Sequence, residues 1–193
     1  MGRPNIGVVI STTRVGRFGD RVAGWLLSLA SQRNDAVYGL VDLRDYPLPF
    51  YDEPVSPSRQ RPQHPVARQL SDRMAAFDGF IFVTAEYNHG IPAVLKNALD
   101  HLYVEMNRKP ASFVGYGSAT GARGIEQLRL NLIQLEMAPL QAWVGLGIHE
   151  LRPLRAHEKD FGDFPHLAAG ASAMLDELMW WTQTLKNGRE NQP

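Results

Sequence analysis

Three short segments, each following an apolar run, contain residues that could bind an anion and a flat ring. The first, residues 11–19 (STTRVGRFG), offers three hydroxyl groups, two guanidinium groups and two glycines at the entrance of a predicted helix. Free N–H groups at a helix N-terminus favour an anion, so this composition is typical of a phosphate site. The alternative is a polar loop whose Ser or Thr caps the helix and whose arginines are solvated.

The second segment, residues 83–100 (VTAEYNHGIPAVLKNALD), begins as a buried strand and ends as an amphipathic helix. Glu86, Tyr87, Asn88 and Gly90 lie between the two elements, where most proteins need only a turn. A flat heterocycle at this junction would meet backbone N–H and C=O groups at its edge and the ring of Tyr87 beside it.

The third segment, residues 116–124 (YGSATGARG), contains three glycines. Glycine lets a ligand approach the backbone closely, and it also serves tight packing and turn geometry alone. Taken together, the three segments indicate one site with a phosphate pocket at one end and a platform for a planar ring at the other.

Several other kinds of site have no support in the sequence. Neither the P-loop pattern G-x-x-x-x-G-K-S/T nor the dinucleotide pattern G-x-G-x-x-G is present, which argues against an NTPase or a Rossmann site. We find no Ser-His-Asp, Cys-His or paired-carboxylate arrangement, and we assign no catalytic side chain. His89 and His101 are interpreted as incidental polar residues, with no metal site predicted. Lys96 and Asp100 are interpreted as a surface ion pair.

The elements that must position these segments follow from the hydrophobic pattern. Near-continuous apolar runs predict buried strands, and apolar residues at helical spacing predict helices between them. Strict alternation of the two predicts a doubly wound α/β fold, whose ligands bind at the carboxyl ends of the strands. The predicted strands are 5–10, 37–43, 79–84, 111–116 and 141–148, and the predicted helices are 18–32, 66–76, 92–106, 121–137 and 165–186.

Length and composition indicate one domain over residues 1–193. Twenty basic and twenty acidic side chains cancel, and no apolar run is long enough to span a membrane, so we expect neither nucleic acid nor a membrane as partner. The absence of cysteine suits a reducing compartment, and we expect the cytoplasm. Residues 44–65 contain six prolines and are expected to form a lid or a partner-facing surface. The tail from Asn187 is expected to be frayed.

The segments STTRVGRFG, VTAEYNHGIPAVLKNALDHLY and KPASFVGYGSATGARG resemble the NAD(P)H-dependent FMN reductase family of the flavodoxin-like superfamily, which also includes quinone and azo-dye reductases. The resemblance covers roughly residues 5–140. It implies a flavodoxin-like five-stranded parallel sheet in the order 2-1-3-4-5, FMN as cofactor, and NADPH or NADH as hydride donor.

Residue by residue, the family motif Gly-Ser-x-Arg falls on residues 11–14, with Ser11 in place of the glycine, and Ala85 stands where many members have proline. The resemblance implies that the side chains of Thr12, Arg14 and Arg17 and the amides of Phe18 and Gly19 hold the FMN phosphate. It also implies that residues 86–88 and 117–119 border the isoalloxazine. The full predicted cofactor set is Ser11, Thr12, Thr13, Arg14, Arg17, Phe18, Gly19, Glu86, Tyr87, Asn88, Gly117, Ser118 and Ala119.

Our leading hypothesis is an enzyme that transfers a hydride from NAD(P)H through FMN to a small-molecule acceptor such as a flavin or quinone. Because only one ring platform is found, donor and acceptor are expected to use it in turn, with ping-pong kinetics. The alternatives are a flavodoxin-type electron carrier, against which the zero net charge argues, and a flavin-free regulatory protein.

The resemblance further implies a homodimer or homotetramer. The apolar residues Leu99, Leu102, Tyr103 and Met106 could contribute to its interface or belong to the core.

Overall fold

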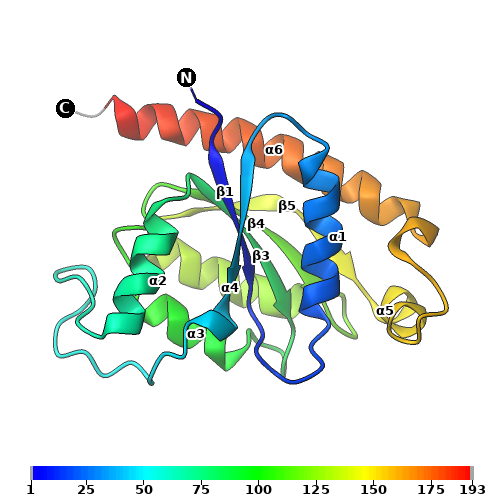
Figure 1. Ribbon diagram of the computed structural model, residues 1–193, viewed down its shortest axis with the longest axis horizontal. Helices are drawn as coiled ribbons and strands as arrows, with labels where there is room; N and C mark the ends of the chain where they lie inside the picture. Colours follow the sequence, from blue (N-terminus) through cyan, green and yellow to red (C-terminus); the bar gives the residue numbers. More distant parts are fainter. Residues whose placement is uncertain (1, 192–193) are drawn as a thin grey trace.

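The protein, described by a computed structural model over residues 2–191, is built on one five-stranded sheet whose strands are all parallel. The strands are β1 (Asn5–Ile10), β2 (Val37–Asp42), β3 (Gly79–Ala85), β4 (Pro110–Tyr116) and β5 (Ala138–Leu146). Their order, β2-β1-β3-β4-β5, confirms the predicted doubly wound, flavodoxin-like sheet (Figure 1). The chain leaves β1 for one edge and returns to its other side at β3, so the switch point lies between β1 and β3.

Helices cover both faces of the sheet (Figure 1). On one face lie α1 (Gly19–Ser31) and α6 (Pro165–Glu190), and on the other lie α2 (Pro65–Ala75), α3 (Ala93–Asp100) and α4 (Ala122–Gln134). Successive strand residues point to opposite faces, so Val8 belongs to the core cluster under α1 and Val9 to the cluster on the opposite face. The central strands β3 and β4 are buried throughout, which explains their continuous apolar sequences.

The predicted elements differ from the structure in two places, after β5 and at the end of α3. A helix not predicted from the sequence, α5 (Ile148–Arg155), follows β5, which ends at Leu146. The predicted helix 92–106 ends at Asp100, although Leu102 and Met106 stay buried and continue the apolar pattern through turns. Together with buried Leu99, they belong to the core cluster, with Tyr103 partly buried against it.

The tail predicted to fray from Asn187 is helical through Glu190, because α6 is held at this end by side-chain contacts. Lys186 and Arg189 both pair with Asp78, at 2.9 Å and 3.1 Å, and Asp78 also accepts a hydrogen bond from the backbone N–H of Asn5 (3.0 Å). Residues 192 and 193 of that predicted tail lie outside the described residues.

Asn97 of α3 anchors the proline-rich segment 44–65 through two hydrogen bonds. Asn97 donates from Nδ2 to the carbonyl of Pro49 (2.8 Å), and its Oδ1 accepts from the backbone N–H of Tyr51 (3.0 Å). Phe50, between these two contacts, is 85% exposed. Among residues 2–191, none of the helices has both the length and the apolar content required to cross a bilayer.

Candidate functional site

A cavity of about 200 Å³ opens at the carboxyl ends of β1, β3 and β4. Parallel strands bring their carboxyl ends to one edge of a sheet, so the three segments singled out in the sequence meet here. The lining residues come from the β1–α1 loop, the ends of β3 and β4, and α5: Arg14, Gly16, Arg17, Phe18, Ala85, Glu86, Tyr87, Tyr116, Gly117 and Arg155.

The β1–α1 loop presents unpaired backbone donors. A turn closed by the N–H of Arg17 and the carbonyl of Arg14 (3.2 Å) has Gly16 at its third position with φ of 67°, a conformation that favours glycine. Of the amides of residues 13–18, only that of Arg17 donates to a described protein atom. No side chain caps α1 at Phe18. These free N–H groups, together with the helix dipole, fit the phosphate of a flavin nucleotide.

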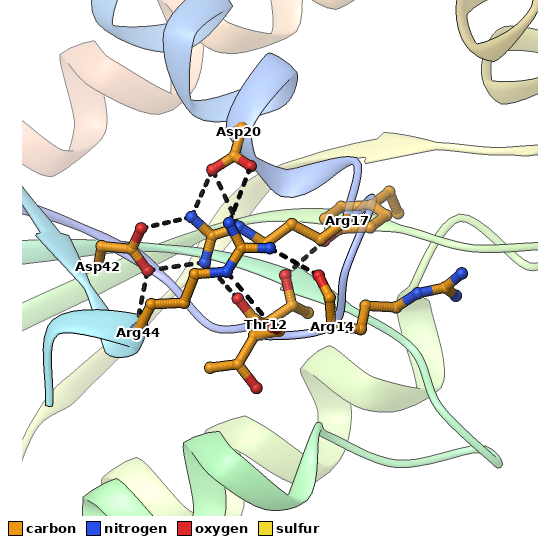
Figure 2. Close-up of polar contacts among 8 residues, drawn as sticks. Thr12, Arg14, Arg17, Asp20, Asp42 and Arg44 are labelled. Atoms are coloured by element: carbon orange, nitrogen blue, oxygen red, sulfur yellow. Dashed lines mark hydrogen bonds and ion pairs between the residues drawn. The ribbon is translucent and has the colours of Figure 1, made fainter. Parts of the chain in front are cut away.

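Arg17 is committed to contacts within the protein (Figure 2). Its Nε donates to Asp20 (2.9 Å), Nη1 donates to Asp42 (2.7 Å) and to the carbonyl of Thr12, and Nη2 donates to both carboxylates. The hydrogen bond to Asp42 is the main cause that raises the pKa of Arg17 above its ordinary value. All five N–H donors of a guanidinium are thereby used, so the Arg17 side chain has none left for a ligand.

Two other arginines line the same cavity without such commitments. The side chain of Arg14 extends away from the Arg17 cluster (Figure 2). Arg155, at the end of α5, lies with its guanidinium carbon 5.5 Å from the centre of the Phe18 ring. Neither side chain forms an ion pair with another described residue. The sequence prediction missed Arg155 because it placed no helix after β5.

Tyr116 connects the β1–α1 loop to β4. Its hydroxyl lies 3.2 Å from Oγ1 of Thr12, and its ring meets Phe18 edge to face at 6.0 Å. Burial raises the pKa of Tyr116, so the phenol stays neutral at ordinary pH. A Cβ at Gly19 would lie 3.0 Å from the phenol oxygen, which explains the glycine at the start of α1. Next in the chain to Thr12, Ser11 is fully buried, and its Oγ has no partner in the described chain.

The β3–α3 junction is a tight hairpin. Tyr87 and Gly90 exchange backbone hydrogen bonds of 3.0 Å and 2.9 Å, and Asn88 and His89 between them have φ of 50° and 66°. This is the geometry of a two-residue type I′ turn, for which asparagine is favoured at the first central position. Asn88 is therefore at the exposed tip, while Tyr87 lines the cavity.

Glu86 joins this hairpin to α4. Its carboxylate, 4% exposed, accepts from the backbone N–H of Arg123 (3.1 Å), from Nε of Arg123 (2.6 Å) and from Nη2. Burial opposes the charged form, but the hydrogen bonds and charge of Arg123 hold the pKa of Glu86 below its ordinary value. Glu86 is thus an ionised clamp that caps α4.

The predicted cofactor residues divide into two groups. Those that line the cavity are Arg14, Arg17, Phe18, Glu86, Tyr87 and Gly117; those in the same loops but not in its lining are Ser11, Thr12, Thr13, Gly19, Asn88, Ser118 and Ala119. Gly16, Ala85, Tyr116 and Arg155 line the cavity but were missing from the prediction. The ion pair of Lys96 and Asp100 is confirmed at 2.7 Å on the surface. Within residues 2–191, no group of three or more His, Asp or Glu could hold a metal ion.

A loop with free backbone amides and the Tyr87 junction lie together at the switch point of a 2-1-3-4-5 sheet, and this arrangement defines a flavodoxin-like protein. Residues 4–150 match the family model described as NADPH-dependent FMN reductase, and the chain belongs to that family.

The curated relatives and solved structures agree with this assignment. An NAD(P)H-dependent FMN reductase of Schizosaccharomyces pombe is 34% identical over 182 residues, covering 85% of this chain and 90% of the relative. A quinone reductase of Pseudomonas putida is 27% identical over 144 residues, covering 71% and 74%. The structure of FerB, a flavoenzyme NAD(P)H:(acceptor) oxidoreductase from Paracoccus denitrificans, superposes with a TM-score of 0.68 at 20% identity, covering 94% and 98%.

Proposed function

We propose that the cavity binds FMN, with the phosphate at the β1–α1 loop and the isoalloxazine between residues 85–87 and Gly117. The observation that carries the proposal is the set of unpaired amides at residues 13–16 and 18, in the same loop that lines the cavity beside the Tyr87 junction. The chain is an oxidoreductase of a family that uses FMN and NAD(P)H. When bound, FMN supplies the two-electron chemistry between the nicotinamide donor and the acceptor.

The charge that complements the phosphate is assigned to Arg14 and Arg155. Both line the cavity, whereas the Arg17 guanidinium is fully bonded within the protein. The amides of residues 13–16 and 18 and the start of α1 add the hydrogen-bond donors. Compared with the expectation from the family motif, the cationic role thus moves from Arg17 to Arg155.

The protein side chains orient the ring and shield it, and they transfer no proton. Glu86 is ionised and bonded to Arg123, and Tyr116 is neutral and bonded to Thr12. Both groups are therefore unsuited to act as a general acid or base near neutral pH. Tyr87 and Phe18 provide the aromatic surface at the two ends of the cavity.

NAD(P)H and the acceptor would occupy the exposed face of the bound flavin in turn, since the described chain has no second nucleotide motif. We expect parallel double-reciprocal lines when NAD(P)H is varied at several fixed acceptor concentrations. Intersecting lines would indicate a ternary complex and contradict the shared face.

The acceptor is proposed to be a free flavin or a quinone. The FMN reductase and quinone reductase relatives support this class. The electron-carrier alternative has no such support, and the zero net charge also argues against a carrier that must meet a charged partner protein.

We also propose a homodimer or homotetramer whose neighbouring subunit closes the open side of the site. Large apolar side chains are exposed at Phe50, Leu130 and Ile133, and such residues are common in subunit interfaces. Light scattering at micromolar concentration tests the proposed oligomer, and a monomer would contradict it.

The central test is a flavin titration of the purified protein followed by anaerobic addition of NAD(P)H. We expect binding of FMN with a shifted flavin absorbance spectrum, and bleaching of that spectrum by NAD(P)H without an acceptor. A protein that binds no FMN would contradict the cavity assignment. A protein that binds FMN but stays oxidised under NAD(P)H would favour the electron carrier.

A further inference from the structure

The outer side of the β1–α1 loop presents three consecutive backbone carbonyls, and an arginine donates to each of them (Figure 2). Arg17 Nη1 donates to the carbonyl of Thr12. Arg44 donates from Nε to the carbonyl of Thr13 (3.3 Å) and from Nη2 to the carbonyl of Arg14 (2.6 Å). Arg44 comes from the start of the proline-rich segment, 30 residues along the chain from Arg14.

A planar trans peptide holds its C=O and the following N–H in opposite directions. Fixing the carbonyls of residues 12–14 on the side of the two arginines therefore fixes the amides of residues 13–15 on the other side. None of these three amides donates to a described protein atom. We propose that Arg17 and Arg44 are positioning residues, which turn these amides toward the phosphate of the flavin without touching it.

The charges of the cluster favour this role over direct attraction of the phosphate. Arg17 and Arg44 face Asp20 and Asp42, so two positive and two negative charges cancel. Net attraction for an anion must then come from the amides and from cations outside the cluster. The role of the two arginines is to fix the orientation of the loop's carbonyls and, through them, of its amides.

Asp42 couples the two arginines to each other. It pairs with Arg17, and its Oδ1 also accepts from the backbone N–H of Arg44 (2.9 Å), where it caps the short 3₁₀ helix η1 (Leu43–Asp45). The end of the edge strand β2 thus sets the position of both guanidinium groups. The proline-rich segment begins within this helix, so its first residues are tied to the β1–α1 loop.

The test uses Arg44→Met, because Arg44 is 38% exposed and its removal leaves the core intact. This inference rests on the proposed binding of FMN. We expect the Kd for FMN to rise about tenfold, the size of one lost charge-assisted hydrogen bond at its low end, and the Kd for riboflavin to change less than twofold, because riboflavin has no phosphate. Equal weakening of both flavins, or no weakening of either, overturns the positioning role.

Two variants separate geometry from charge and from general stability. Arg44→Lys keeps the positive charge but offers one point donor that cannot span two carbonyls, so we expect it to recover only part of the FMN affinity; full recovery means that charge alone mattered and overturns the inference. Arg73→Met is the matched control, since Arg73 also donates to a backbone carbonyl, that of Leu40 in β2 (3.2 Å), but does not line the cavity. We expect its FMN affinity to match the wild type.

Hydrogen exchange gives a direct measure of the amides. Inorganic phosphate should slow exchange at residues 13–15 in the wild-type protein and have at least a fewfold weaker effect in Arg44→Met. Equal protection in both proteins overturns the inference. Failure of the wild-type protein to bind FMN at all would instead contradict the proposed function, so the two failures remain distinguishable.

Discussion

The two ends of the cavity are each held by an arginine and a carboxylate, but the buried partner is different. At the β1–α1 loop the arginine is buried, with the side chain of Arg17 2% exposed and that of Asp20 50% exposed. At the β3–α3 hairpin the carboxylate is buried, with Glu86 4% exposed and Arg123 41% exposed. An arginine–carboxylate pair is therefore used at both ends, but it pairs a different kind of backbone group at each.

The backbone groups that need a partner explain this difference. In the first loop a carbonyl turns outward and requires a donor, which Arg17 supplies to Thr12. At the start of α4 the free groups are amides and require an acceptor, which Glu86 supplies to Arg123. The first arrangement leaves amides of the β1–α1 loop free on the cavity side, whereas the second uses the Glu86 carboxylate to pair an amide at the start of α4. This is why we assign the phosphate to one end and the ring to the other.

The largest effect is expected from Arg17→Met. The substitution removes the buried guanidinium that pairs with Asp42 and Asp20, and removal of one member of a buried ion pair typically costs 3 to 5 kcal/mol. Since Asp20 is half exposed, we expect a loss of about 3 kcal/mol in the free energy of unfolding, measured with urea. As a control, Arg61→Met removes an exposed pair with Asp72 and should change stability by less than about 1 kcal/mol. Equal losses in the two variants would contradict the structural assignment of Arg17.

The second prediction concerns Glu86, which pairs with Arg123 at the β3–α3 hairpin. Glu86→Gln replaces charge-assisted hydrogen bonds to Arg123 by neutral ones and should lower the free energy of unfolding by about 2 kcal/mol at pH 7. The folded protein lowers the pKa of Glu86, so its contribution is full above the unfolded value near pH 4.3 and is lost as the pH falls through the folded value. The difference in the free energy of unfolding between wild type and Glu86→Gln should therefore become smaller below about pH 4.

Glu126→Gln is the matched control for that prediction. Glu126 also faces an arginine on α4, Arg129 at 3.6 Å, but its side chain is largely exposed. We expect a change of less than about 0.5 kcal/mol at pH 7. A difference in the free energy of unfolding between wild type and Glu86→Gln that stays constant between pH 3 and 7 would show that packing, and not charge, holds the hairpin.

The third prediction tests the charge at the phosphate end. Arg14→Met and Arg155→Met should each weaken FMN about tenfold while leaving riboflavin nearly unchanged, because both side chains are exposed and their contacts fall at the weak end of charge-assisted bonds. Arg152→Met, on the same helix as Arg155 but outside the cavity lining, should bind FMN like the wild type. If Arg152→Met and Arg155→Met are equally weakened, the assignment of Arg155 is wrong.

The smallest effect is expected at the tip of the hairpin. Asn88 has φ of 50°, where alanine is strained by roughly 1 kcal/mol and glycine is not. Asn88→Ala should therefore lower the free energy of unfolding by about 1 kcal/mol in urea, and Asn88→Gly by a few tenths. Indistinguishable alanine and glycine variants would mean that the turn relaxes away from the type I′ geometry.

Much of the scaffold was predictable because buried parallel strands carry a strong signal. Apolar runs such as residues 79–84 can satisfy their backbone only in the middle of a sheet, and the loops after β1, β3 and β4 must then meet at one edge. The helix α5 was missed because Pro153 and four charged or histidine side chains hide its short apolar stripe. Because α5 was not predicted, Arg155 at its end was not predicted as a cavity residue either.

The detailed roles within the site were less predictable. The sequence around Arg17 predicts a ligand-binding arginine, but its partner Asp42 lies 25 residues away at the end of β2. Only the pairing of β1 with β2 brings the two together, with Ile10 opposite Asp42. Likewise, Glu86 lies 37 residues from Arg123, so its task as a clamp depends on where α4 begins.

Asp78 has a practical consequence for attaching the protein to a surface. It contacts both Asn5 and Arg189, so the beginning and the end of the described chain lie beside one another at the edge of the sheet opposite the cavity (Figure 1). A tether joined near Asn5 or near Arg189 would therefore leave from the same side. A protein immobilised through either position on a bead or an electrode would turn its cavity to the solution.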